Sequence, residues 1–383
     1  MTAGDGLGPS TPRRWIRPGL RVAAALVPPV LVFAAVRWLF AIAAARVGYD
    51  ASNPFSWRRW DSGHYLDIAS RGWELFSCAR LGGRPQDACG NSAWFPLYPW
   101  LLRPLLALGL RRETAGVWVS GTAALAMLVV LWNGLLRERR LKGFVVLAIA
   151  GVFPGAVYAH AIFPTSLALL CIVLAGTALA RGRWVLMGLS GAALAMTYVT
   201  GVLLAVPNAV AAWWRTRALR PAVVAGGLTA AGFVSVLLAQ QLILGHWDAW
   251  IRTYQKGLPG VARPLEAFLA VIAPVFTNDL PRRTIAIQAL TVLGLLVLGL
   301  VTAAVTRHRR NPVRTWAALS ALLFWAFPLL AGRGVSLYRA DALVLPVILL
   351  LVELPVWLLL PLLLWLARVA EAMGELFFRG YLV

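Results

Sequence analysis

Long apolar runs restrict the possible folds of this chain more strongly than any other feature. About 20 predominantly apolar residues are enough for a helix to cross a bilayer, and we count roughly ten such runs. Because lipid offers the backbone no hydrogen-bonding partner, each run must satisfy its own amides as an α-helix. The clearest runs are residues 22–45, 114–136, 221–244, 284–305 and 341–367.

The composition supports the same fold class. Hydrophobic residues make up 60% and charged residues 13% of the 383 residues, which is too little polar surface to cover a soluble globule. We therefore expect an all-α integral membrane protein, with a tail at residues 1–21 and a single membrane domain at residues 22–383. The first run has spanning length and no small-residue cleavage site, so we expect it to be retained as a helix.

The positive charge is concentrated in short segments between the apolar runs. The net charge is +21, and its arginines gather before residue 22 and at residues 137–142, 181–183, 215–220 and 307–314. Basic segments next to spans stay in the cytoplasm, which predicts a cytoplasmic amino terminus. Nucleic-acid binding is not expected, because these clusters lack interleaved aromatic residues.

The remaining long polar segments then belong to the outer face. They are residues 46–113, 245–283 and 331–340, and together they would form one outer site. The chain has only two lysines, Lys142 and Lys256, against many arginines. This bias is typical of GC-rich bacterial genomes, so we expect a multi-pass protein of the plasma membrane.

The middle of the chain contains apolar segments that are short for a membrane span. Pro154, Pro164 and Gly201 interrupt them. Irregular backbone at membrane depth must be buried in protein or face a water-filled cavity. These segments are either bent helices that line a cavity or ordinary kinked spans packed together.

A polar, aromatic stretch follows the first apolar run, with the sequence WRRWDSGHYLDIASRGW at residues 57–73. If it is helical, Asp61, His64 and Tyr65 share one face, whereas Asp67 is rotated away from Asp61 by about 120°. This spacing favours one general base over a pair of carboxylates acting across one bond. The alternative is that Asp61 only pairs with Arg58 or Arg59 at the membrane surface.

A metal site is not indicated. The chain has four histidines, and it has neither an HExxH motif nor a His/Cys cluster of the kind that binds zinc. Asp61 together with Asp67 or Asp248 could hold a divalent cation, but their spacing does not establish it.

Two further features belong to the first outer segment. Cys78 and Cys89 can pair there, because disulfides persist outside the cytoplasm; two free thiols are the alternative. The second feature is WFPLYPWLLRPLL, whose prolines prevent it from starting as a regular helix. Trp94, Tyr98 and Trp100 suit the headgroup level, so membrane anchoring is their simplest role.

The combination of WDSGHY with FPLYP resembles the PIG-V family of membrane mannosyltransferases and its bacterial relatives. The family run W-D-x-x-H-Y/F-L-x-I-A-x-x-G-Y/W is matched from Trp60 to Trp73, and FPLYP lies at residues 95–99. The similarity continues through GVFPGAVYAHAIF, GHWDAWIRTYQ, SLYRADALVLP and FFRGYLV. It covers most of the chain.

The resemblance implies a GT-C-type polytopic helical bundle that transfers a hexose, mannose in this family, from a polyprenyl-phosphate sugar to an acceptor hydroxyl with inversion. Asp61 is then the catalytic base. The implied substrate-binding residues are Trp60, His64, Tyr65, Arg59, Tyr98, Trp247, Arg333 and Arg339. Among these, the three arginines can compensate the leaving phosphate. The acceptor, a glycolipid or a protein hydroxyl, is not specified.

The chain departs from the family pattern at two positions. Family members carry glutamate in Y-S-E-S-L and arginine in T-R-x-x-G, where this chain has Thr165 and Tyr198. This double change leaves open a non-catalytic GT-C-like partner subunit. A lipid or sugar-lipid transporter is a second alternative, because bent short helices and outer-side arginines would also suit the movement of a lipid phosphate.

Overall fold

The computed structural model describes residues 18–136, 140–254, 263–306, 311–331 and 337–382. Within these ranges the chain is almost entirely helical, and six helices are long and apolar enough to cross a membrane. The six are α1 (Pro18–Arg46), α4 (Arg112–Gly134), α10 (Leu219–Leu244), α13 (Leu280–Val305), α14 (Pro312–Leu330) and α17 (Val356–Arg379). The protein is therefore an all-α membrane protein, while the total of roughly ten spans stays a prediction.

Four of the five clearest runs correspond to α1, α4, α10 and α13. Helix α1 begins at Pro18, and its candidate membrane span begins at Val22. The fifth run, 341–367, is wrong as a single span. It is divided into η6 (Asp341–Val347), α16 (Ile348–Leu351) and the first half of α17. The division falls before Pro355, because a proline cannot continue a helix and disfavours helical backbone in the residue before it.

The middle of the chain forms short helices that break where the sequence indicates. They are α5 (Leu141–Gly151), α6 (Ala156–His160), α7 (Thr165–Arg181), α8 (Trp184–Ala195), η3 (Val199–Leu204) and α9 (Ala205–Thr216). Pro154 lies in the break before α6, Pro164 in the break before α7, and Gly201 within η3. Since the break between α8 and η3 lines a cavity, the bent, cavity-lining alternative holds for this pair.

The short helices occupy the interior. All seven residues of η6 are buried, and so are most residues of α7. Around them, α4, α8 and α14 pack against α7, and α14 packs against η6. An interior helix contacts protein on all sides, so it is apolar around its whole circumference.

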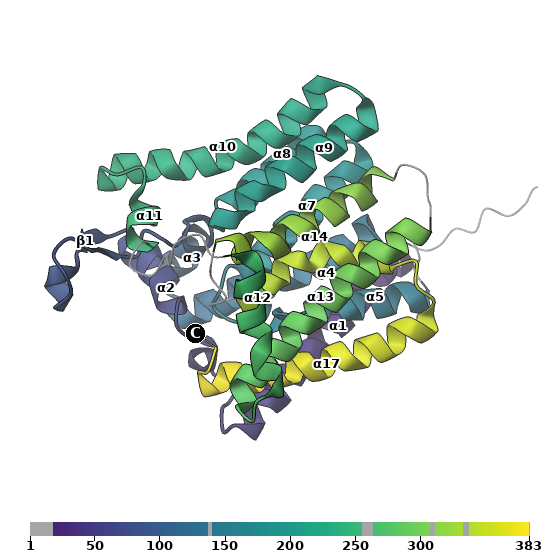
Figure 1. Ribbon diagram of the computed structural model, residues 1–383, viewed down its shortest axis with the longest axis horizontal. Coiled ribbons are helices and arrows are strands. Elements are labelled where there is room, and N and C mark those ends of the chain that lie inside the picture. Colours follow the sequence, from purple (N-terminus) through teal and green to yellow (C-terminus); the bar gives the residue numbers. More distant parts are fainter. Residues whose placement is uncertain (1–17, 137–139, 255–262, 307–310, 332–336, 383) are drawn as a thin grey trace, which may run out of the picture.

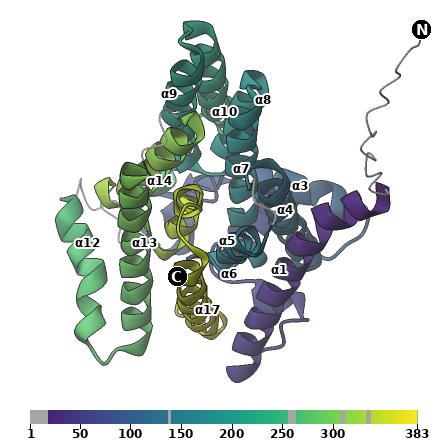
Figure 2. The same cartoon turned by 90° about the vertical axis from the view of Figure 1, so that its right-hand side faces the viewer.

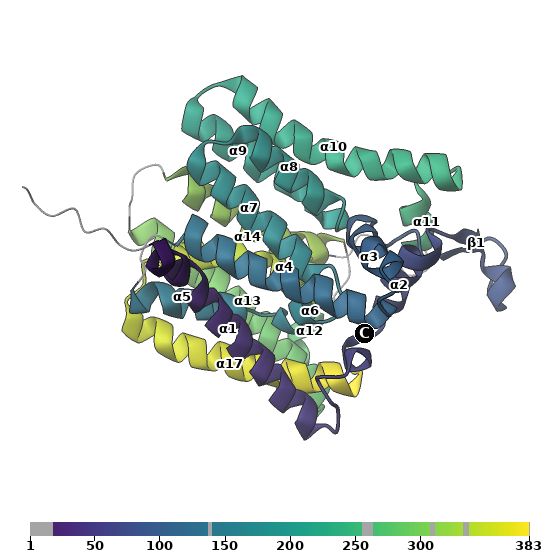
Figure 3. The ribbon, with the colours of Figure 1, turned by 180° about the vertical axis from the view of Figure 1, so that it is seen from behind.

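The segments predicted for the outer face gather at one end of the bundle. Figures 1 and 3 show there α2 (Ser62–Arg71), α3 (Leu97–Ala107), α11 (Ala249–Tyr254) and the hairpin of β1 (Leu75–Ser77) and β2 (Ala88–Gly90). The loop between α9 and α10 lies at the other end (Figure 1). In Figure 2, α8, α9 and α10 form one flank of the bundle, and α12 (Pro264–Ile272) with α13 forms another.

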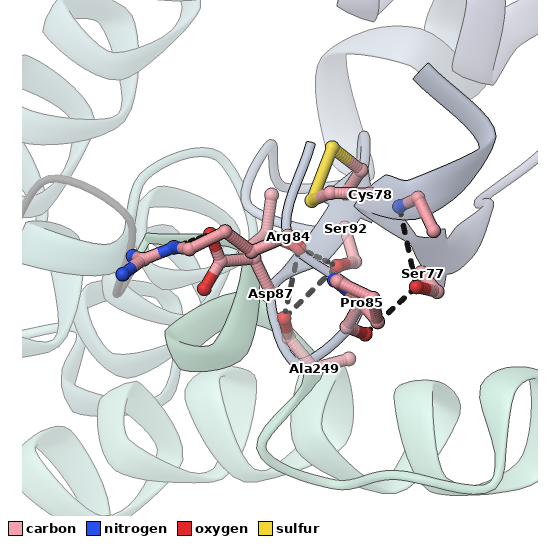
Figure 4. The surroundings of a disulfide bond; sticks show 10 residues. Ser77, Cys78, Arg84, Pro85, Asp87, Ser92 and Ala249 are labelled. Atoms are coloured by element: carbon pink, nitrogen blue, oxygen red, sulfur yellow. Dashed lines mark hydrogen bonds and ion pairs between the residues drawn. A yellow bond between two sulfur atoms is a disulfide. The ribbon is translucent and has the colours of Figure 1, made fainter. Parts of the chain in front are cut away.

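The hairpin is closed by a disulfide between Cys78 and Cys89, the pairing predicted from the sequence, with Cα atoms 5.0 Å apart (Figure 4). The strands pair antiparallel, with Phe76 opposite Cys89. The Ser92 hydroxyl lies just beyond β2 and donates to the Ala249 carbonyl at 2.9 Å. This contact joins the hairpin to α11, so two segments that are far apart in sequence, both predicted for the outer face, form one unit.

Candidate active site

A cavity of about 420 Å³ opens at the same end of the bundle. The residues that line it come from several separate segments. These are the start of α2, residues 93–95, the break between α8 and η3, α11, the end of α14, and α15 (Leu337–Ala340) with η6. Among the described lining residues, only Asp61 and Arg339 carry a charge. The other lining residues are mostly aromatic and aliphatic, so these two charged side chains face a largely apolar cavity.

Asp61 lies at the N-terminal boundary of α2. The residue before it, Trp60, has a positive φ of 41°, which is uncommon for a residue other than glycine and costs about 1–3 kcal/mol when it is maintained. The Arg59 amide donates to the Ser62 hydroxyl at 3.1 Å. This strained turn directs the chain into the helix immediately beside the cavity.

The partner of Asp61 is Arg339, which donates from Nη1 to Asp61 Oδ2. The sequence alternative, pairing with Arg58 or Arg59, is therefore wrong: Arg58 pairs instead with Glu113 at 2.9 Å. Burial disfavours the charged form of Arg339, but the Asp61 carboxylate, together with Tyr158 and Tyr338, outweighs burial and raises the pKa of Arg339 above its ordinary value.

Two aromatic rings support the Arg339 guanidinium from the protein side. Its central carbon lies 6.0 Å from the centroid of Tyr158 and 5.7 Å from that of Phe163. Cation–π contacts of this kind stabilise a cation away from water. Helix α6, which carries Tyr158, and the break after it, which carries Phe163, therefore supply the aromatic surface against which the Arg339 guanidinium packs.

The predicted common face of Asp61, His64 and Tyr65 is only partly a cavity face. Asp61 and Tyr65 line the cavity. The imidazole of His64 instead stacks on Trp94, with ring centroids 3.6 Å apart, and Trp94 borders the cavity. Burial lowers the pKa of His64 below 6.5, although the carboxylates of Asp61 and Asp67 act in the opposite direction. The neutral ring is therefore a support for Trp94.

The two departures from the family pattern contact each other. The hydroxyls of Thr165 and Tyr198 lie 3.0 Å apart and share a hydrogen bond. Thr165 is buried at the start of α7, and Tyr198 lines the cavity. A neutral hydrogen bond thus stands at this wall where the pattern would put a glutamate and an arginine.

Three other predicted binding residues do not line the cavity. Arg59 donates to the carbonyls of Phe377 and Phe378 at the end of α17, at 3.2 and 2.9 Å. Trp60 and Trp247 are exposed and do not line the cavity. Arg333 lies outside the described residues.

Tyr98 is also placed differently from either expectation. It is fully buried in α3 and donates to the Gly116 carbonyl at 3.1 Å, so it neither anchors at a headgroup nor reaches the cavity. Helix α3 begins at Leu97 despite Pro99. A proline in the first turn is tolerated, because its missing N–H would have no partner in the helix anyway.

The other aspartates considered for a cation are committed to arginines. Asp67 pairs with Arg112 at 3.1 Å and with Arg71 at 3.3 Å, and Asp248 pairs with Arg252 at 2.9 Å. In the part of the chain that the structure describes, no three His, Cys, Asp or Glu side chains form a group that could hold a metal.

Sequence reasoning did not identify most of the cavity wall. The missed residues are Trp94, Phe95, Thr197, Tyr198, Thr200, Trp250, Phe327, Leu337 and Leu343, among others. The aromatic residues after the hairpin and the break near Gly201 were the only signals for them. Their convergence depends on how distant helices pack, which no local pattern encodes.

Comparison with protein-family models and with curated proteins finds no match for this chain.

Proposed function

We propose that this protein is a membrane glycosyltransferase of the GT-C type. It transfers a hexose, mannose by the resemblance to the PIG-V family, from a polyprenyl phosphate to an acceptor hydroxyl. The single observation that carries the proposal is the Asp61–Arg339 pair at the polar point of an otherwise apolar cavity. A base beside a phosphate-binding cation is what this reaction needs, and an apolar chamber suits a lipid-linked donor.

In the proposed reaction, the acceptor oxygen attacks the anomeric carbon and its proton passes to the Asp61 carboxylate. The bond between the anomeric carbon and the phosphate oxygen breaks on the opposite side, and the phosphate leaves with the bonding electrons. The configuration at the anomeric carbon inverts. Arg339 stabilises the charge that develops on the phosphate, and arginine can do so through two parallel hydrogen bonds.

Because of the ion pair, the donor would bind before Asp61 takes the proton of the acceptor. While Arg339 donates to Asp61 Oδ2, that oxygen is already engaged and cannot take the proton of the acceptor. A donor phosphate competes for the same guanidinium. Donor binding would therefore release Asp61 at the moment when a base is required.

The test is transfer of labelled mannose from polyprenyl-phosphate mannose in vesicles that contain the full-length protein. Wild-type protein should form a labelled glycolipid or glycoprotein, and Asp61→Asn and Arg339→Gln should not. No transfer by the wild-type protein with any acceptor fraction, together with intact donor binding, would refute the enzyme and favour a non-catalytic subunit. Movement of labelled donor across the vesicle without transfer would favour the transporter.

The non-catalytic alternative has one specific observation behind it, the Thr165–Tyr198 hydrogen bond. If the reaction needs the ion pair of the family pattern at this wall, the double variant Thr165→Glu/Tyr198→Arg should create transfer in an inactive wild type. If the wild type is active, the same double variant tests whether the neutral pair sets donor preference.

A further inference from the structure

A second depression in the surface lies far from the cavity, between the starts of α8 and α10. This groove has a volume of about 670 Å³ and is lined by Arg183, Trp184, Leu186, Leu189, Arg220 and Val224, among others. Helix α10 has 26 residues and ends next to α11, so its start is about 38 Å from the cavity end at 1.5 Å per residue. The groove therefore belongs to the opposite end of the bundle.

The groove has a charged mouth and an apolar floor. Arg183 and Arg220 are exposed, and within the described residues no ion pair is formed by either. Trp184 is half-buried next to them. Leu186 and Leu189 are 39% and 52% exposed, so an apolar strip leads away from the two arginines along α8.

Helices α8 and α10 pack closely at Gly188 and Gly191 of α8. A Cβ on Gly188 would lie 2.7 Å from the Leu228 Cβ, and one on Gly191 would lie 2.1 Å from the Thr229 hydroxyl. Small residues allow two membrane helices to approach closely. The groove is thus the part of the α8–α10 interface at which glycines do not bring the two helices into close contact.

The charge around the groove has one sign. Arg181, Arg215 and Arg217 lie close to it in sequence, and no aspartate or glutamate occurs between Glu138 and Asp248. Arg215 is already engaged, because it donates to the Leu179 carbonyl and lies 5.7 Å from the Trp184 ring centroid. An occupant with a net negative head and an apolar tail would complement both parts of the groove.

We propose that this groove binds one anionic phospholipid, with its phosphate between Arg183 and Arg220 and an acyl chain along Leu186 and Leu189. Basic pockets between helices at the cytoplasmic side of membrane proteins suit such headgroups, and a tryptophan at the mouth suits the interface. A zwitterionic headgroup fits less well, because its ammonium group adds a further positive charge at a groove whose described lining residues include no carboxylate. The proposal does not depend on the glycosyltransferase activity.

The experiment is native mass spectrometry of the full-length protein released from nanodiscs that contain equal amounts of phosphatidylglycerol and phosphatidylcholine. Wild-type protein should retain one phosphatidylglycerol in preference to phosphatidylcholine. Each arginine near a headgroup contributes about 1 kcal/mol, which is about a 5-fold effect, so Arg183→Gln/Arg220→Gln should reduce the preference about 30-fold.

The matched control is Arg181→Gln/Arg217→Gln, which removes the same two charges close by without altering the groove lining. It should keep most of the preference. Val224→Trp tests the apolar part, because it fills the groove without changing charge, and it should reduce lipid retention even if the double arginine variant folds poorly. Equal losses in the two double variants, or no lipid preference in the wild type, would overturn the proposal.

Discussion

At the residue scale, the proposed chemistry depends on the ion pair between Asp61 and Arg339. Their side chains are 26% and 18% exposed, so both charges are largely shielded from water, and their mutual attraction offsets the cost of removing them from it. Removing either member leaves its partner charged in a mostly apolar cavity, which is costly. A ligand that restores the missing charge should then bind more tightly.

Asp61→Asn should therefore have two opposite effects. Transfer should fall by about 10² to 10⁴, because asparagine cannot accept the proton. Binding of polyprenyl phosphate should strengthen by about tenfold, because Arg339 has lost its internal anion. Both can be measured with nanodisc-reconstituted protein.

Asp67→Asn is the matched control for this change. Asp67 lies in the same helix, but it pairs with Arg112 and Arg71 and does not line the cavity. It should alter neither transfer nor phosphate binding by more than a few-fold. Equal losses of transfer at both positions would instead indicate a shared metal site, and weaker phosphate binding by Asp61→Asn would contradict the proposed competition.

His64 should make the stability of the outer segment depend on pH. Its pKa in the folded protein is lowered below 6.5 by burial, so the unfolded chain binds a proton more readily. Stability is then fully present above about pH 6.5 and decreases as the pH falls towards the pKa of the folded state. In thermal unfolding followed from about pH 8 to about pH 5, His64→Phe should show a smaller decrease, because it keeps a ring on Trp94 and does not titrate. An identical pH dependence in both proteins would refute the assignment.

At the scale of elements, Gln288 connects α13 to the segment that carries Arg339. Its amide donates to the Tyr338 carbonyl at 2.9 Å and to Asp341 Oδ2 at 2.8 Å. Its carbonyl accepts from the Gly155 amide at 3.4 Å, in the break before α6. Gly155 has a φ of +80°, and an added Cβ would lie 3.1 Å from the Tyr338 carbonyl. The Gln288 side chain thus connects α13 to the break before α6 and to Tyr338 and Asp341, which lie within two residues of Arg339.

Gln288→Leu should lower stability by about 1–3 kcal/mol, because the buried Asp341 carboxyl loses a hydrogen-bond donor. It should also weaken phosphate binding, because Arg339 would be held less firmly. Gln241→Leu is the control, since Gln241 lies at the exposed end of α10 and accepts from the Trp247 amide. Thermal unfolding and polyprenyl-phosphate binding check both variants. Loss of stability with unchanged phosphate binding would limit Gln288 to a structural role.

The disulfide should stabilise the hairpin by about 3 kcal/mol, the loop-closure value for a loop of this size. Trypsin can cleave after Arg80, within the loop that Cys78 and Cys89 close. Without reductant the cut chain should stay joined, and reductant should separate it on a denaturing gel. Peptide mapping that finds both cysteines as free thiols would contradict the disulfide.

At the scale of the whole molecule, the distribution of charge predicts which end of the bundle faces which side of the membrane. Trp247 lies at the cavity end and Arg217 at the groove end. Trp247→Cys should react with an impermeant thiol reagent from outside intact cells, and Arg217→Cys should react only after the membrane is opened. Cys171 is buried, so it adds little background. Labelling of both positions from the same side would contradict the topology.

Some of this organisation could be predicted from the sequence alone. The long spans α1, α4, α10 and α13 follow from apolar length, which acts locally through the cost of unpaired backbone in lipid. The breaks at Pro154 and Pro164 follow from the missing amide of proline, which is also local. The helix of residues 62–71 places Asp61 and Tyr65 on one side, as its period predicts.

The composition of the site was decided only by the tertiary structure. Asp61 could have paired with Arg58 or Arg59, its neighbours in sequence, yet its partner is Arg339, 278 positions away. Likewise the Thr165–Tyr198 contact and the stacking of His64 on Trp94 depend on how α7, α8 and the outer segment pack. Local periodicity determines which face of a helix is apolar, but it does not say which distant helix covers that face. The sequence therefore determined that this is a helical membrane protein with a polar segment after its first span, and packing decided which of its charges meet.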